Sequence, residues 1–157
     1  MLADLFYHLS AQTRYLRYFQ PVPLSLHNAW VEGRRMARRS VVHGLTLIAT
    51  VQPGERAEAV GVAELAVDPR APTRGELAVT VRDDQQGHGI GTALLRQVVK
   101  EAQARGIAEL HGDLLPENRA ALRLLRRLPV PVETVFDAGT IHVVLRLSQE
   151  LPDAAAE

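Results

Sequence analysis

The sequence has no cysteine, a single lysine (Lys100) and only 4% aromatic residues. The lack of cysteine excludes disulfide bonds, thiolate ligands for a metal ion and a cysteine nucleophile. Long hydrophobic runs are also missing, and none approaches the roughly 20 residues that span a bilayer. The first residues, MLADLFYHLSAQTR, carry polar groups too early for a signal peptide. We therefore expect a cytoplasmic protein without a membrane partner.

The chain also lacks an excess of one charge, because 18 basic side chains balance 18 acidic ones. Proteins that bind nucleic-acid phosphates usually carry a basic excess, so we expect no nucleic-acid partner. The six histidines have no paired spacing typical of metal sites, and we expect no metal either. One basic run fits a solvated helix face or a patch that attracts an acidic partner. It consists of Arg34, Arg35, Arg38 and Arg39.

Apolar residues make up 46% of the 157 positions, which is enough for one packed domain. We expect this domain over residues 1–147, followed by a flexible tail over 148–157. Helices are predicted over 2–19 (with an N-cap or break at Ser10), 25–39, 91–105 and 117–128. Strands are predicted over 45–50, 59–67, 76–81, 108–114, 132–136 and 141–147.

The lengths of the connections indicate the fold class. Between residues 44 and 82 they are too short for crossover helices, so three strands should form an antiparallel meander. Parallel pairing can occur only where the helix 91–105 crosses over, between strands 76–81 and 108–114. The sequence thus predicts an α+β fold with a mixed, mostly antiparallel sheet. Trp30 is expected in its core.

The most informative segment runs from Val79 to Thr92, VTVRDDQQGHGIGT. A strand leads into a turn with glycine at every second position, and the turn opens a helix. Glycines let backbone N–H groups turn towards one point, and the helix start adds unpaired N–H groups and the positive end of its dipole. Such a segment is typical of a phosphate or pyrophosphate site. The alternative is an ordinary glycine turn.

Two common phosphate-binding loops do not match this segment. The nucleotide-binding P-loop needs a lysine after its last glycine, and no lysine is present here. The dinucleotide fingerprint Gly-x-Gly-x-x-Gly has a different spacing and belongs early in a βαβ unit. Here the glycines follow an antiparallel meander, so both ligand classes are disfavoured.

The run Gln86-Gly-His-Gly-Ile-Gly91 matches Gln/Arg-x-x-Gly-x-Gly/Ala, and with it the sequence resembles the GNAT superfamily of N-acetyltransferases. Asn118 and Ala121 are similar to the Asn-x-x-Ala pair of that family. The resemblance covers roughly residues 2–147. It implies a sheet that splays between the strand before the turn and the next strand, acetyl-CoA as co-substrate, and an amine as acceptor. It also allows a homodimer.

The resemblance implies cofactor-binding roles for residues of the turn and its surroundings. Main-chain groups of the turn should hold the pyrophosphate, and the strand before it should pair with the pantetheine arm. The expected residues are Val79, Val81, Gln86, Gly87, His88, Gly89, Ile90, Gly91, Thr92 and Asn118. Asn118 fits a simple helix cap as well. His88 stands where many relatives carry a cationic residue, and its protonation should tighten cofactor binding below pH about 6.5.

The resemblance further implies direct attack of the amine on the acetyl thioester. A lysine ammonium, with a pKa of about 10.4, must first lose a proton. Glu76, ten residues before Gln86, is the candidate general base. Two alternatives stay open, since Glu76 can be an exposed strand residue and an inward Glu64 can serve instead. Many relatives use a tyrosine as general acid at the position of Leu125, so the acid is unassigned here.

A narrower resemblance concerns the acceptor. Residues 9–19, LSAQTRYLRYF, and 75–81, GELAVTV, are similar to segments of bacterial protein lysine acetyltransferases that modify acyl-CoA synthetases. This implies a protein lysine as acceptor, and a small-molecule amine is the alternative. The family usually begins with a strand before the first helix, so either that strand is absent here or the start is trimmed, and the family's tyrosine is missing. A non-catalytic acyl-CoA-binding sensor is therefore the competing function.

Overall fold

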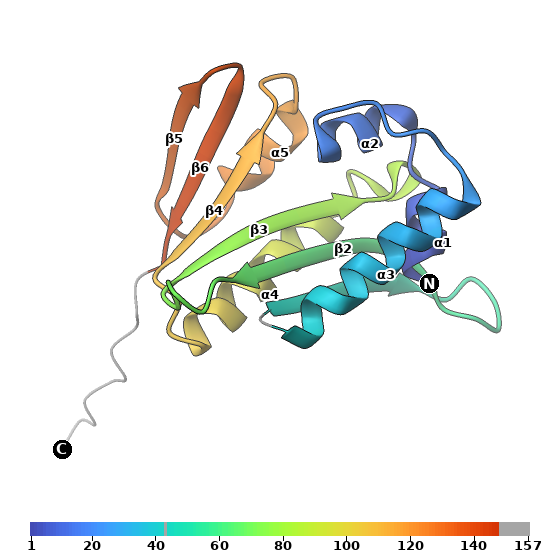
Figure 1. Ribbon diagram of the computed structural model, residues 1–157, viewed down its shortest axis with the longest axis horizontal. Helices are drawn as coiled ribbons and strands as arrows, with labels where there is room; N and C mark the ends of the chain where they lie inside the picture. Colours follow the sequence, from blue (N-terminus) through green and yellow to red (C-terminus); the bar gives the residue numbers. More distant parts are fainter. Residues whose placement is uncertain (43, 148–157) are drawn as a thin grey trace.

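The computed structural model describes residues 1–42 and 44–147, and Figure 1 shows its helices and strands. The tail predicted over 148–157 lies outside these residues. The helices are α1 (Leu2–Tyr7), α2 (Ala11–Tyr18), α3 (Leu26–Val42), the 3-10 helix η1 (Asp83–Gln85), α4 (Ile90–Ala104) and α5 (Arg119–Leu125). The strands are β1 (Gly44–Val51), β2 (Glu58–Val67), β3 (Arg74–Val81), β4 (Glu109–Leu114), β5 (Val132–Asp137) and β6 (Thr140–Arg146).

Ser10 separates the first two helices, as the sequence predicts. Its side chain caps α2 by accepting a hydrogen bond from the N–H of Thr13 at 3.1 Å. The cap ends one helix and begins the next, so the predicted segment 2–19 is two short helices. None of the helices in residues 1–42 and 44–147 is long and apolar enough to cross a bilayer.

The predicted antiparallel meander is confirmed. β2 pairs with β1 on one side and with β3 on the other, both antiparallel. Residues opposite each other in adjacent strands share a face of the sheet. Leu65 and its partner Leu77 therefore point to the face covered by α4, here called the α4 face. Glu64 and its partner Ala78 point to the opposite face, here called the α3 face.

The sheet has six strands in the order β1-β2-β3-β4-β6-β5. Its one parallel pair joins β3 to β4, as predicted, and spans only three positions, from Arg74 opposite Glu109 to Glu76 opposite His111. Beyond Glu76 and His111 the two strands diverge, and Figure 1 shows β4, β6 and β5 turning away from β3. We call this last paired position, Glu76 and His111, the apex of the splayed sheet. The predicted splay is confirmed.

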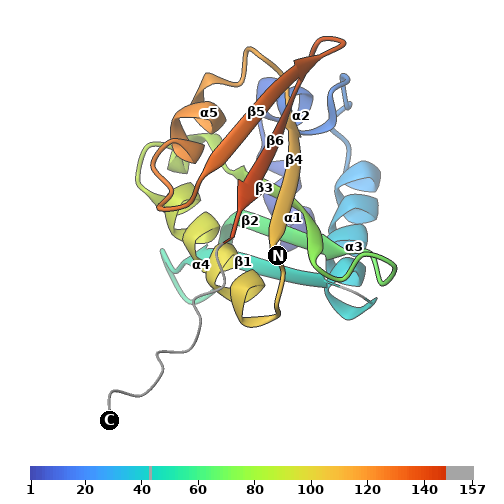
Figure 2. The same cartoon turned by 90° about the vertical axis from the view of Figure 1, so that its left-hand side faces the viewer.

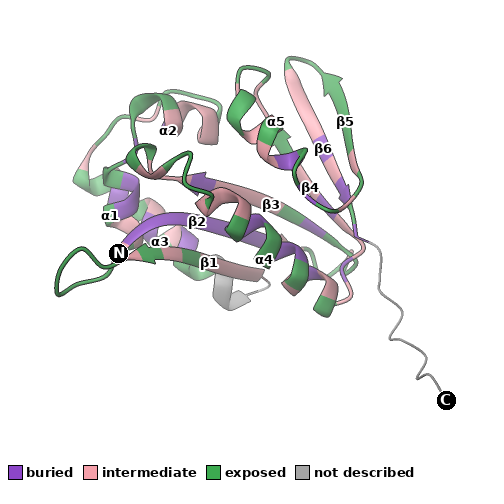
Figure 3. Cartoon of the chain, turned by 180° about the vertical axis from the view of Figure 1, so that it is seen from behind, coloured by how far each residue is buried: buried purple, intermediate pink, exposed green. Residues whose placement is uncertain are grey.

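Helices cover both faces of the sheet. In Figure 2, α4 and α5 lie on one side and α1 and α3 on the other, and Figure 3 shows that β2 between them is the most continuously buried strand. The buried residues under α4 include Leu65, Leu94, Val98, Leu110, Leu125 and Leu145. Those under α1 and α3 include Leu5, Phe6, Leu9, Ala29, Met36 and Val62.

The core position expected for Trp30 is wrong. Its side chain is 57% exposed, and the guanidinium of Arg34 lies 4.6 Å from the centre of its ring. Ala29 and Met36 supply the inward face of α3 instead. A cation stacked on the indole lets Trp30 stay on the surface of this helix.

Candidate functional site

Glycines form the turn between β3 and α4 because its backbone enters the left-handed region. Gly87 has φ of 78° and Gly89 has φ of 83°, and L-amino acids with side chains rarely adopt such values. A Cβ atom on either residue would meet nothing within 4 Å. The turn therefore needs glycine for its backbone conformation, and it leaves open space above the main chain.

Backbone donors line this open space. The N–H of Ala93 donates to the carbonyl of Gly89 at 3.0 Å and starts the hydrogen-bond pattern of α4. The six N–H groups before it, from Gly87 to Thr92, have no acceptor in the part of the chain that the structure describes. Gly89, at the N-cap of α4, has no side chain that could satisfy them. These donors and the helix dipole form a site for an anion.

Gln86 and Gly91 position the turn. The side-chain amide of Gln86 donates to the carbonyl of Val81 at 3.0 Å and so ties the turn to the end of β3. A Cβ on Gly91 would lie 3.3 Å from a methyl group of Leu124 in α5. Glycine therefore allows α4 to begin close to α5. His88 is exposed at the tip of the turn, and Ile90 and Thr92 are half-buried in the first turn of α4.

Sequence reasoning missed Asp83, which connects the turn to α2. Its carboxylate accepts hydrogen bonds from the N–H of Ser10 at 2.9 Å, the hydroxyl of Ser10 at 2.6 Å and the hydroxyl of Thr13 at 2.7 Å. Partial burial raises the pKa of Asp83, but these hydrogen bonds outweigh burial and hold the pKa below its ordinary value. No local spacing could reveal the contact, because the partners are about 70 residues apart in sequence.

The edge of β3 beyond the apex is open. The N–H of Arg82 donates to the carbonyl of Val60 in β2. Because backbone groups alternate along a strand, those of Val79 and Val81 point away from β2, into the gap towards β4. In the described residues β3 has no partner strand on this edge beyond Glu76. The structure thus puts Val79 and Val81 where an extended ligand can pair with them, although the carbonyl of Val81 already accepts from Gln86.

Asn118 caps α5, which is one of its two expected roles. Its side-chain oxygen accepts from the N–H of Ala121 at 3.2 Å. The NH₂ group of the same side chain has no acceptor among residues 1–42 and 44–147, so capping leaves it free to donate to a ligand. Leu125, at the position of the family's tyrosine, is buried in the core under α4. It offers no proton donor.

The two candidate carboxylates lie in different environments. Glu76 is exposed on the α3 face at the apex. Glu64 is 1% exposed, and it accepts from Arg17 at 2.8 Å and from Arg35 at 3.2 Å. The hydrogen bonds that Arg35 donates to Glu32, together with the charge of Glu64, raise the pKa of Arg35 above its ordinary value. Two cations compensate the charge of Glu64, which suits a structural role, whereas a solvent amine can reach Glu76.

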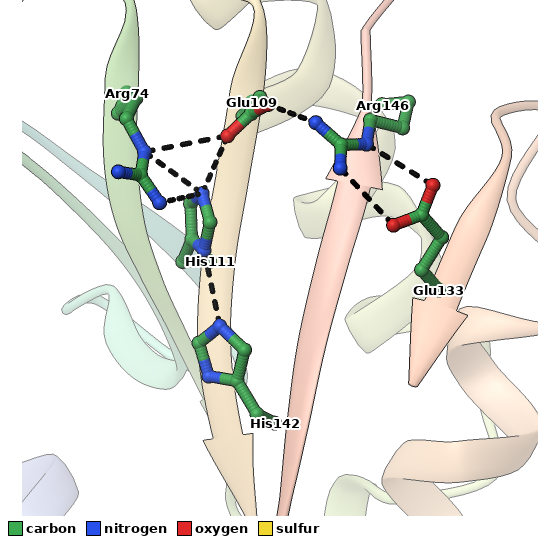
Figure 4. Close-up of polar contacts among 6 residues, drawn as sticks. All are labelled: Arg74, Glu109, His111, Glu133, His142 and Arg146. Atoms are coloured by element: carbon green, nitrogen blue, oxygen red, sulfur yellow. Dashed lines mark hydrogen bonds and ion pairs between the residues drawn. The ribbon is translucent and has the colours of Figure 1, made fainter. Parts of the chain in front are cut away.

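Sequence reasoning also missed a polar network on the α3 face, next to Glu76 in the pairing of β3 with β4. Figure 4 draws its residues except Asp113. The residues of the network come from four strands and are Arg74, Glu109, His111, Asp113, Glu133, His142 and Arg146. The alternation Glu109-Leu-His111-Gly-Asp113 does indicate a polar face on this strand, because every second strand residue points to the same side of a sheet. The partners on β6 and β3 could not be identified without the register of the sheet. No three carboxylate or histidine side chains in the described residues are arranged to hold a metal ion.

His111 is the half-buried centre of this network, and its side chain is 14% exposed. Burial lowers the pKa of His111 below its ordinary value, and the nearby charges of Arg74 and His142 act in the same direction. Glu76 and Asp113 oppose this shift. A cavity of about 390 Å³ opens beside the ring, lined by Thr73, Arg74, Ala108, Glu109, His111 and Arg146.

Comparisons with known proteins agree with this geometry. A family model described as "Acetyltransferase (GNAT) family" matches residues 6–128. The L-methionine sulfoximine/L-methionine sulfone acetyltransferase of Pseudomonas paraeruginosa is 40% identical over 53 residues, which are 34% of this chain and 31% of that relative. The matched segment thus spans about a third of the relative's length.

Solved structures share the fold. The GNAT domain of S. lividans PAT has a TM-score of 0.76 and 23% identity, with 93% of this chain and 83% of that chain covered. A GNAT superfamily phosphinothricin acetyltransferase from Sinorhizobium meliloti, solved in complex with AcCoA, has a TM-score of 0.68 and 16% identity. That match covers 100% of this chain and 90% of the other. At these identities the likeness concerns the fold alone.

Proposed function

Because the chain belongs to the acetyltransferase (GNAT) family, we propose that it transfers an acetyl group from acetyl-CoA to a primary amine. The observation that carries this proposal is the row of N–H groups from Gly87 to Thr92, for which residues 1–42 and 44–147 provide no acceptor. These donors suit the pyrophosphate of CoA, because they and the helix dipole favour negative charge at one point. His88 adds an exposed side chain at the tip of the turn, where many relatives carry a cation.

The open edge of β3 suits the rest of the cofactor. An extended pantetheine arm can hydrogen-bond to Val79 and Val81 as an added strand does. The free NH₂ group of Asn118 can donate to the same arm. Bound acetyl-CoA supplies the acetyl thioester, and a backbone N–H of β3 at the gap stabilises the charge that develops on the thioester oxygen.

Glu76 acts as the general base in this proposal. It lies at the apex, where β3 and β4 begin to diverge, and it is open to solvent on the α3 face. The acceptor reaches it as an ammonium with a pKa of about 10.4. Glu76 takes a proton from this group, directly or through a water molecule, and the neutral amine then attacks. The bonds of Glu64 to Arg17 and Arg35 favour Glu76 over Glu64.

The acceptor is a small-molecule amine or a protein lysine. The name of the Pseudomonas paraeruginosa relative supports an amino-acid derivative, over the 53 residues that align. The segment 9–19 supports a protein lysine, since it is similar to part of the bacterial lysine acetyltransferases. Release of CoA should be compared across a panel of amino-acid analogues, polyamines, aminoglycosides and lysine peptides.

One observation favours a second function, that of a non-catalytic acyl-CoA sensor. Leu125 is buried where many relatives carry a tyrosine, so this position cannot protonate the leaving thiolate. A thiol with a pKa of about 8.5 is a tolerable leaving group, and water can supply the proton. We therefore favour the enzyme, and turnover separates the two functions.

Two measurements on the purified protein test the proposed function. Acetyl-CoA at 100 times its Kd should stabilise the fold by about 2.7 kcal/mol, which raises the Tm by about 5–10 °C. Free CoA should then form continuously when a suitable amine is present. A raised Tm without CoA release from any amine of the panel identifies the sensor. An unchanged Tm at millimolar acetyl-CoA contradicts both functions.

A further inference from the structure

A chain of hydrogen-bonding side chains crosses the sheet at the apex (Figure 4). The Nδ1 atom of His111 lies 3.1 Å from Nε2 of His142. The Nδ1 atom of His142 in turn lies 2.8 Å from a carboxylate oxygen of Asp113. At the other end, Nε2 of His111 contacts Arg74 at 3.1–3.2 Å and a carboxylate oxygen of Glu109 at 2.9 Å. The imidazole of His111 thus has a partner on both nitrogens.

We assign the histidine tautomers from the hydrogen bond of Arg74 to Nε2 of His111. Arg74 can only donate, so its hydrogen bond requires a lone pair on Nε2 of His111. The single proton of a neutral His111 ring is then on Nδ1 and points to His142. His142 likewise keeps its proton on Nδ1, where Asp113 accepts it. All bonds of the resting chain therefore run in one direction, from Arg74 to Asp113.

One contact is left without a proton in this arrangement. Nε2 of His111 and the carboxylate of Glu109 are 2.9 Å apart, yet both present lone pairs. A proton that arrives at Nε2 turns this contact into a hydrogen bond to an anion, which is stronger than a neutral one. Glu109 thereby stabilises the state that follows arrival of a proton at His111.

Exposure rises along the chain. The side chain of His111 is 14% exposed, that of His142 is 43% and that of Asp113 is 54%. The chain therefore leads from the apex to solvent. His111 sits opposite Glu76 in the register of β3 and β4, on the same face of the sheet. A carboxylate holds a proton only briefly at neutral pH, so a general base at Glu76 benefits from a second acceptor at this position.

We propose that His111, His142 and Asp113 relay to solvent the proton that Glu76 removes from the acceptor ammonium. This inference rests on the proposed function. The N–H bond of the ammonium breaks and its proton binds Glu76, which passes it to Nε2 of His111. The proton on Nδ1 of His111 moves to Nε2 of His142, and the proton on Nδ1 of His142 moves through Asp113 to water. Each ring loses one proton and gains one. The resting tautomers return when Nε2 of His111 releases its proton to water in the adjacent cavity, Nε2 of His142 returns a proton to Nδ1 of His111, and water reprotonates Nδ1 of His142.

The charged groups around the relay keep His111 neutral at pH 7, so that it can accept a proton. Its rings face charged and titratable groups from β3, β4, β6 and β5, which are Arg74, Glu76, Glu109, Asp113, His142, Arg146 and Glu133. Glu109 and Glu133 engage Arg146, so that its charge is compensated. Burial and Arg74 lower the pKa of His111, which is therefore neutral at pH 7 and able to accept a proton.

The test replaces His142 and follows amine acetylation from pH 6 to 10. For His142→Gln we expect kcat at pH 7 to fall about 10-fold, with the KM for acetyl-CoA unchanged. The defect should shrink towards pH 10, because the amine then arrives without its extra proton. Added imidazole should restore much of the activity of His142→Ala. His8→Gln, at an exposed site on the end of α1, is the matched control and should behave as wild type.

Two results overturn the relay. One is full activity of His142→Gln at pH 7. The other is a loss of equal size at every pH that imidazole does not restore, because this points to a structural role. A wild-type protein that releases no CoA with any amine contradicts the proposed function instead, so the two failures can be told apart. Thermal unfolding of His142→Gln, His142→Ala and His8→Gln checks that each variant folds.

Discussion

The glycine turn before α4 and the polar network on β4 and β6 assemble their groups in different ways. The turn takes its donors from residues 86–92, which follow one another in the chain. The network takes its side chains from four strands between Arg74 and Arg146. A continuous segment can present main-chain groups whatever its exact side chains are, whereas the network depends on sheet register. The turn can therefore be recognised from the sequence alone, whereas the network requires the structure.

The largest expected effect is at the apex, where Glu76 lies beside the polar network. Glu76→Gln should lower kcat at pH 7 by about 100-fold or more, because it removes the general base. The Tm and the stabilisation by acetyl-CoA should stay as in wild type, since Glu76 is exposed. Steady-state release of CoA measures the rate. Full turnover at saturating acetyl-CoA would show that Glu76 is not the base.

Glu64→Gln is the matched control for this variant. It leaves Arg17 and Arg35 without their buried anion, and breaking a buried ion pair costs about 3–5 kcal/mol. The Tm should therefore fall by about 10 °C, while kcat of the folded protein at 20 °C changes little. The opposite pattern, a lost kcat with an unchanged Tm, would make Glu64 the base.

The next prediction tests whether the turn binds acetyl-CoA, by comparing two glycines whose replacement strains the backbone to a similar extent. Gly89→Val should weaken acetyl-CoA binding by about 50-fold, because valine cannot hold φ of 83° and two or more N–H groups turn away from the diphosphate. Gly106→Val is the control, since Gly106 has φ of 74° after the end of α4, away from the turn. Both variants lose stability, and calorimetric titration should detect weaker binding in the first alone.

A smaller effect concerns the link between the turn and α2. Asp83→Asn removes the anion that binds Ser10 and Thr13, so the position of α2 beside the turn becomes less defined. We expect the KM for the amine to rise about 5-fold, with a smaller change for acetyl-CoA. An equal rise in both values would argue against a link to the acceptor side.

The pH dependence of stability gives a second measurement on Asp83→Asn. The folded-state pKa of Asp83 lies below its unfolded value of about 3.8. Asp83 therefore contributes to the free energy of unfolding above pH about 4, and this contribution is lost as the pH falls through the folded-state pKa. When the pH is lowered below 4, the Tm of the variant should decrease less than the Tm of the wild type. An equal loss in both proteins would show that the hydrogen bonds of Asp83 contribute nothing to stability.

The smallest effect is at His88. This exposed side chain lies beside the turn, where many relatives carry a cation. Between pH 8 and pH 5.5 the acetyl-CoA affinity of the wild type should rise about 3-fold, and that of His88→Gln should stay constant. A wild-type affinity that does not vary with pH would exclude a role for His88 in binding.

The fold and the turn could be predicted because their signals are local. Ser10 marks a helix start, and the spacing of Gly87, Gly89 and Gly91 marks a main-chain anion site. The short connections between strands dictate the meander and leave one place for a parallel pair. Each of these features depends on neighbouring residues in the chain.

The network and Asp83 could not be predicted, because they depend on distant residues. His111 and His142 are 31 positions apart and meet only because β4 pairs with β6. Trp30 also could not be placed from the sequence. Its helical spacing predicts a core position, but in the structure it is exposed and stacks with Arg34. Side chains from separate strands or helices acquire their role from register and packing.

Hydrogen–deuterium exchange of the backbone between Gly87 and Thr92 is the most direct measurement of the central claim. Without ligand these amides should exchange rapidly, because the described residues offer them no acceptor. Saturation with CoA should slow their exchange at least 10-fold, and the amide of Gly106 should stay unchanged. Slow exchange before CoA is added, or rapid exchange at saturation, would contradict the account.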